Sequence, residues 1–200
     1  MVTYPDPAKP EDILAYLAGL IRDVHHCLDD GVSFADTVMA DLRPDGHLWS
    51  ALVRHRALTL LDAAGLSPKR LLNSGIELER GRFTLKVFRS QDDGPPAPGH
   101  SRTRRAYYSQ YRQGSLAIGG PAIPVDGTNL ILDWEATSER AILLALSLPL
   151  GVWKHKGQPS IDWRRPVQLD DTGLRFESSD EGLEVPPRFE IGEDEEGEEA

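Results

Sequence analysis

The sequence predicts an α+β fold in which an N-terminal three-helix segment packs with an antiparallel β-sheet, followed by a disordered acidic C-terminal tail. Two periodicities and one charge pattern support this prediction. Apolar residues recur every three or four positions up to residue 65, and at every second position from residue 76. Residues 170–200 hold 13 acidic and 2 basic side chains. With 200 residues, the chain is long enough to bury a sizeable core, in one domain or in two.

The chain divides by composition into segments of different character. They are a flexible leader (1–9), a helical segment (10–66), a β-hairpin (67–89), a Pro/Gly-rich loop or linker (90–103), a short helix plus antiparallel strands (104–169) and the acidic tail (170–200). The loop has no large apolar residue, so we expect it to bury little and to be mobile. Repulsion between like charges is expected to keep the tail solvated.

Three helices are expected before residue 66. Pro10 suits the first position of the first helix, and an apolar stripe follows it until Asp29-Asp30-Gly31, which predicts the end of that helix. A short second helix is expected to start at Ser33. The third helix is expected to start after Asp45, which can cap it, and to stop at Gly65.

The remaining elements are predicted to be mainly strands. Apolar residues alternate on both sides of Arg80-Gly81, which predicts a β-hairpin. Residues 104–112 are expected to form a short helix. Three later strand candidates, paired most simply as a meander, follow in order: 129–135, 141–148 and 160–169.

The net charge of −10 is unevenly distributed along the chain. Residues 1–169 hold 20 basic and 19 acidic side chains, so the negative charge lies in the tail. Residues 80–112, in contrast, hold eight basic side chains and only Asp92 and Asp93 as acidic ones. The body of the protein therefore carries a local basic segment beside a polyanionic tail.

A basic and aromatic constellation is the strongest candidate for a binding site. Guanidinium and ammonium groups neutralise phosphates, and aromatic rings can stack on unpaired bases. The alternative is that these aromatic side chains pack the core while the arginines lie in solvent. The candidate contact residues for nucleic acid or another partner are Arg80, Arg82, Lys86, Arg89, Arg102, Arg104, Arg105, Tyr107, Tyr108, Tyr111, Arg112, Lys154, Lys156, Trp163, Arg164 and Arg165.

No catalytic, metal or cofactor site is predicted. His25, His26 and Cys27 lie close to acidic residues on the first helix, but we interpret them as a solvated helix face beside a small buried thiol. The sequence contains none of the local motifs that mark common nucleophilic or metal-dependent enzymes. An enzyme with a dispersed site near the 90–103 loop would draw on His100, Ser101, Tyr107 and Tyr108.

We therefore expect a non-enzymatic binding or regulatory protein that acts through contacts with another macromolecule, either nucleic acid or protein. The acidic tail is expected to modulate the basic-aromatic surface. The alternatives are a protein–protein adaptor of a bacterial or phage accessory system, the enzyme described above, and a structural or solubility role. The absence of a long apolar run predicts no membrane partner, and a single cysteine suits the cytoplasm. The sequence leaves the oligomeric state open.

Overall fold

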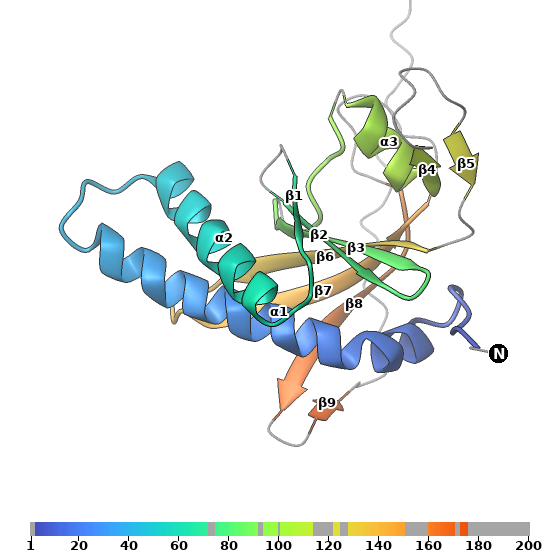
Figure 1. Ribbon diagram of the computed structural model, residues 1–200, viewed down its shortest axis with the longest axis horizontal. Helices are drawn as coiled ribbons and strands as arrows, with labels where there is room; N and C mark the ends of the chain where they lie inside the picture. Colours follow the sequence, from blue (N-terminus) through green and yellow to red (C-terminus); the bar gives the residue numbers. More distant parts are fainter. Residues whose placement is uncertain are drawn as a thin grey trace, which may run out of the picture.

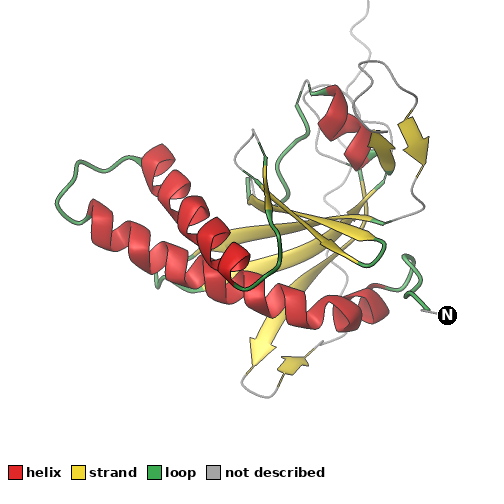
Figure 2. Cartoon of the chain, viewed as in Figure 1, coloured by secondary structure: helices red, strands yellow, loops and turns green. Residues whose placement is uncertain are grey.

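The computed structural model describes residues 3–71, 75–91, 94–99, 101–113, 122–124, 128–150, 160–170 and 173–175. Figure 1 shows two long helices packed as a hairpin along a twisted sheet, with a small group of elements lying away from that hairpin. Figure 2 shows the same arrangement by secondary structure. The α+β class is therefore confirmed.

The first helix, α1 (Pro10–Met39), is continuous, so the predicted break at Asp29-Asp30-Gly31 and the separate helix from Ser33 are wrong. Gly31 is buried where α1 crosses the second helix, α2 (Gly46–Ala63). A Cβ atom at Gly31 would lie 2.7 Å from the carbonyl oxygen of Val53. The glycine is therefore required by the close approach of two backbones and does not end the helix.

Helix α2 begins and ends where the sequence predicts. The Asp45 carboxylate accepts hydrogen bonds from the backbone N–H groups of His47 (2.8 Å) and Leu48 (3.1 Å), and these bonds lower the pKa of Asp45. Gly65 follows the helix with φ +77°, a left-handed conformation that glycine adopts without strain. One face of α2 is buried against α1 and the sheet.

The main sheet has the strand order β1-β2-β3-β6-β7-β8-β9. Its strands are β1 (Lys69–Arg70), β2 (Ile76–Arg80), β3 (Phe83–Arg89), β6 (Asn129–Ala136), β7 (Ile142–Pro149), β8 (Ile161–Asp170) and β9 (Gly173–Arg175). The predicted hairpin (β2–β3) and meander (β6–β7–β8) are confirmed. The strand β9, which pairs with β8, falls within the predicted tail, and residues 176–200 lie outside the described part.

The prediction of an entirely antiparallel sheet is wrong, because β3 and β6 pair in parallel. Parallel neighbours cannot be joined by a tight turn and need a crossover connection. The chain between β3 and β6 supplies it and contains α3 (Arg102–Tyr108) and a separate two-stranded sheet of β4 (Tyr111–Gln113) and β5 (Ala122–Pro124). The predicted helix at 104–112 therefore ends earlier, and Tyr111 belongs to a strand.

The two faces of the sheet contact different elements, as the alternation along β3 illustrates. Leu85 and Val87 belong to the main core with α1 and α2, whereas Phe88 packs with Tyr107 and Tyr108 of α3. The described part of the 90–103 segment also buries more than expected. Pro95, Pro96 and Pro98 are buried, and the Tyr108 hydroxyl donates a hydrogen bond to the Pro96 carbonyl.

Within the described ranges, none of the helices combines the length and the hydrophobicity that crossing a bilayer requires.

Two glycine-to-alanine substitutions in α1 should change stability in opposite directions. Gly31→Ala places a methyl group against the Val53 carbonyl and should destabilise the protein by about 1–3 kcal/mol. At Gly19 a Cβ atom meets nothing within 4 Å, so Gly19→Ala should stabilise it by about 0.5–1 kcal/mol. Denaturant unfolding measures both effects. A Gly31→Ala variant as stable as wild type would contradict the role assigned to the close helix contact.

Candidate anion-binding groove

A groove runs along α2 where this helix meets the edge of the main sheet. Three adjoining hollows form it, all lined by described residues. The first, about 260 Å³ in volume, is bordered by Arg54 and Arg70. The second is bordered by Arg54 and Arg89. The third, about 350 Å³, is bordered by Arg89 and Arg140. Neighbouring hollows share an arginine, and we call the three hollows together the arginine groove.

Different elements place the arginines in this groove. Arg54 follows the buried Val53 on α2, so its side chain lies at the margin of the buried helix face. Arg70 in β1 pairs with Ile76, and Arg89 at the end of β3 pairs with Trp134 of β6. Both therefore project from the helix-covered face of the sheet, towards α2.

Three of these arginines have no ion pair among the residues that the structure describes: Arg54, Arg70 and Arg89. Burial lowers the pKa of Arg54, and the nearby charge of Arg70 lowers it further. Two neighbouring cations without a counter-ion are an arrangement that a bound anion would stabilise. Arg140, in contrast, lies 3.2 Å from a carboxylate oxygen of Asp36.

Aromatic and polar neighbours hold Arg89 in place without neutralising it. Its Nη1 atom donates to the Ser50 hydroxyl at 2.6 Å, and its guanidinium lies 5.2 Å from the centre of the Trp49 ring. The Trp49 indole is held by a hydrogen bond to Asp36 (2.8 Å) and packs against the Trp134 ring. The groove therefore offers fixed positive charge, while the Trp49 ring already contacts Arg89, Asp36 and Trp134.

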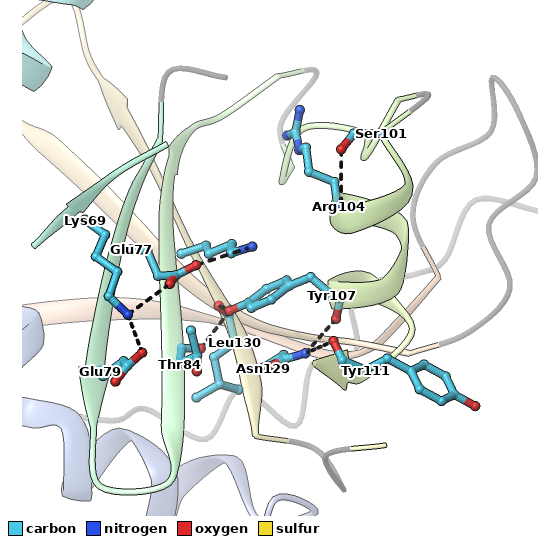
Figure 3. Close-up of polar contacts among 11 residues, drawn as sticks. Lys69, Glu77, Glu79, Thr84, Ser101, Arg104, Tyr107, Tyr111, Asn129 and Leu130 are labelled. Atoms are coloured by element: carbon cyan, nitrogen blue, oxygen red, sulfur yellow. Dashed lines mark hydrogen bonds and ion pairs between the residues drawn. The ribbon is translucent and has the colours of Figure 1, made fainter. Parts of the chain in front are cut away.

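Of the sequence-predicted contact residues, the structure buries four: Lys86, Tyr107, Tyr108 and Trp163. The Tyr107 hydroxyl lies within hydrogen-bond distance of the Thr84 (2.7 Å) and Leu130 (2.6 Å) carbonyl oxygens, as Figure 3 shows. The Trp163 indole donates to the Pro7 carbonyl at 3.1 Å. The three aromatic side chains therefore pack the two cores, and all four residues expose little surface to a macromolecular partner.

Most of the predicted arginines are engaged elsewhere in the fold. Arg82 donates to the Pro5 carbonyl (2.6 Å), and Arg105 donates to the Gly99 carbonyl (2.9 Å). Arg164 forms an ion pair with the buried Asp133 at 2.6 Å. The Arg104 guanidinium lies 4.8 Å from the centre of the Phe88 ring. Arg165 Nε lies 3.9 Å from a carboxylate oxygen of Glu11.

The remaining predicted residues are either exposed or outside the described part of the chain. Arg80, Arg102 and Tyr111 are exposed. Lys154, Lys156 and the Arg112 side chain lie outside the described residues. Among the described members of the predicted set, only Arg89 borders the arginine groove.

Sequence reasoning missed the other members of the groove. One local signal was available: Ser50 and Leu58 lie one helical turn from Arg54, so no carboxylate neutralises Arg54 along α2. Nothing in the linear sequence, however, links positions 54, 70, 89 and 140.

Two other candidate sites from the sequence, the His25-His26-Cys27 cluster of α1 and the residues around Ser101, are partly described by the structure. No group of three or more His, Cys, Asp or Glu side chains in the described part could hold a metal ion. Cys27 is buried, which raises the pKa of its thiol. The Ser101 hydroxyl caps α3 by accepting a hydrogen bond from the Arg104 N–H at 3.3 Å, and His100 lies outside the described residues.

Comparisons with protein-family models, with curated proteins and with solved structures found no match.

The buried tyrosines predict a loss of stability in alkaline solution. Burial raises the pKa of Tyr108 to about 12 and that of Tyr107 well above its usual value, whereas an unfolded tyrosine ionises near 10. Their contribution to stability is therefore complete below about pH 10 and is lost progressively as the pH rises towards 12. Denaturant unfolding should show that the free energy of unfolding decreases between pH 9 and pH 11. The decrease should be smaller in Tyr108→Phe. An identical pH dependence in Tyr108→Phe would contradict the prediction.

Proposed function

We propose that this protein is a non-enzymatic binding or regulatory protein that binds nucleic acid through the arginine groove. The observation that carries the proposal is the row of Arg54, Arg70 and Arg89, which border adjoining hollows and have no ion pair among the described residues. Binding of a phosphate backbone would supply the missing negative charge.

The shape and chemistry of the groove favour a phosphate chain over a single small anion. The cations that border it are arginines, whose planar guanidinium groups bind phosphate oxygens in pairs. Residues 49–58 of α2 line it, which corresponds to about 14 Å at 1.5 Å per residue. Measured along the helix axis of B-DNA, each strand carries one phosphate about every 3.4 Å, so a groove of this length can contact more than one phosphate.

The acidic tail fits into this proposal as a competitor. Residues 170–200 hold 13 acidic side chains, so a polyanion tethered to the same chain can compete for the arginine groove. We propose that the tail weakens nucleic-acid binding. We also propose a cytoplasmic location, for which the free thiol of Cys27 is the supporting observation.

A protein partner is the second candidate, and exposed apolar side chains at the end of the helical hairpin favour it. Val38, Leu42 and Leu48 are all exposed near the connection between α1 and α2. Large exposed apolar side chains that gather in one region are typical of protein contact sites. This surface belongs to the adaptor alternative and does not involve the arginine groove.

Two neighbouring arginines of α2 give a matched test of nucleic-acid binding. Arg54→Ala should weaken binding of labelled single- and double-stranded DNA or RNA, and should reduce the slope of log affinity against log salt by about 1. Arg56→Ala should change neither, because Arg56 already pairs with Asp30 at 2.6 Å on the outside of the helical hairpin. Fluorescence anisotropy over a salt series measures both. Absence of binding by the wild type at low salt, or equal losses in the two variants, would refute the proposal and favour the protein partner.

Neutralising the end of the tail in the full-length chain should increase the affinity. The variant combines Glu193→Gln, Asp194→Asn, Glu195→Gln, Glu196→Gln, Glu198→Gln and Glu199→Gln. Because these changes remove competing negative charge, binding should tighten most at low salt. The gain should disappear when Arg54→Ala and Arg70→Ala are added. An affinity equal to that of the wild type would show that the tail does not occupy the groove.

A further inference from the structure

A second cavity, of about 240 Å³, lies between the β2–β3 hairpin and α3. It opens on the face of the sheet opposite to α1 and α2, so it is separate from the arginine groove. Its lining includes Glu77, Lys86, Tyr107 and Asn129. Figure 3 shows Glu77 and Glu79 on the hairpin side and Tyr107 and Tyr111 on the side of α3 and β4. The volume is suited to a molecule smaller than a typical drug.

Lys86 contributes a buried amine to this cavity. The residue is 5% exposed and lies in the middle of β3, between Leu85 and Val87. Because Leu85 and Val87 point into the main core, the lysine side chain must project from the opposite face, under α3. A lysine is rarely buried unless a partner or a function retains it.

The positive charge of Lys86 is only partly compensated by its neighbours. Its Nζ atom lies 3.5 Å from Glu77 Oε2, which is longer than the usual 2.7–2.9 Å of a charge-assisted hydrogen bond. The Glu77 carboxylate also lies 3.7 Å from the Lys69 amine. Lys69 lies closer to Glu79, at 2.7 Å. The Tyr107 ring supports the amine from one side, with 3.8 Å between Nζ and the ring centre.

Burial increases the unprotonated fraction of the Lys86 amine relative to that of an exposed lysine. Burial lowers the pKa of Lys86, the nearby Arg104 charge lowers it further, and Glu77 opposes both effects. Glu79 also lines the cavity, and Lys69 forms an ion pair with Glu79. Burial holds the pKa of Tyr107 well above its usual value, so its hydroxyl stays neutral. A larger fraction of this amine is therefore nucleophilic at neutral pH than for an exposed lysine.

We propose that Lys86 forms an imine with a small aldehyde or ketone that enters this cavity. The nitrogen lone pair attacks the carbonyl carbon to give a carbinolamine, the carbon–oxygen bond then breaks, and one water molecule leaves as the C=N bond forms. No oxidant or reductant takes part. Glu77 is close enough to Nζ to exchange protons during these steps. The protonated imine keeps the positive charge of the lysine, so it retains the contacts with Glu77 and the Tyr107 ring.

Reductive trapping tests the proposal on the full-length protein. The chain has five lysines, Lys9, Lys69, Lys86, Lys154 and Lys156, so each site of reaction can be assigned by peptide mass mapping. Limiting acetaldehyde with cyanoborohydride at pH 7 should modify Lys86 several-fold faster than Lys9. Lys86→Arg should abolish labelling at position 86 and leave the slower labelling of the other lysines unchanged. Preferential modification of the other lysines, or reaction of Lys86 only after unfolding, would overturn the proposal.

The pH dependence of trapping separates a reactive amine from a purely structural ion pair. Glu77→Gln removes the carboxylate that raises the pKa of Lys86, so its labelling profile should move to lower pH. The Lys9 profile, measured in the same sample, should not move. An unchanged Lys86 profile in Glu77→Gln would also overturn the proposal. Arg54→Ala should leave trapping intact, so this result is independent of nucleic-acid binding.

Discussion

Both candidate sites depend on the parallel pairing of β3 with β6. This pairing places Arg89 beside Trp134 at the end of β3, which brings the arginine to the groove below α2. It also obliges the chain to cross over before β6, and the crossover carries α3 to the opposite face of the sheet. An antiparallel β3–β6 pair joined by a short turn would leave Lys86 uncovered, since Tyr107 comes from that crossover.

A buried polar network fastens the crossover to the sheet. The Gln110 side chain donates to the carbonyl oxygens of Asn129 (2.9 Å) and Pro149 (2.7 Å) and accepts from the Asn129 N–H (3.0 Å). Asn129 in turn donates to the carbonyl oxygens of Tyr107 and Tyr111. Gln110 has φ +57°, a strained conformation for a non-glycine residue that these bonds hold in place. The network thus fixes α3 over Lys86.

The two kinds of arginine in this fold differ in what balances their charge. Arg164 binds the buried Asp133, and Arg56 joins the two long helices through Asp30. These ion pairs connect elements of the fold to one another. Arg54 and Arg89, in contrast, are placed by α2 and by the end of β3, and neither forms an ion pair with a described residue. Positive charge that the fold positions but does not neutralise is the property that makes the groove a candidate for a polyanion.

The sequence by itself determined the elements whose signals are local: the Asp45 cap, the Gly65 stop, the β2–β3 hairpin and the later meander. Only the tertiary structure decided the rest. Gly31 resembles a helix stop, but the backbone of Val53, distant in sequence, explains it. The predicted basic-aromatic surface divided because alternate residues of a strand face opposite sides, so Lys86 and Arg89 belong to different sites. Local patterns record a residue's neighbours along the chain, whereas a binding site depends on neighbours that folding brings together.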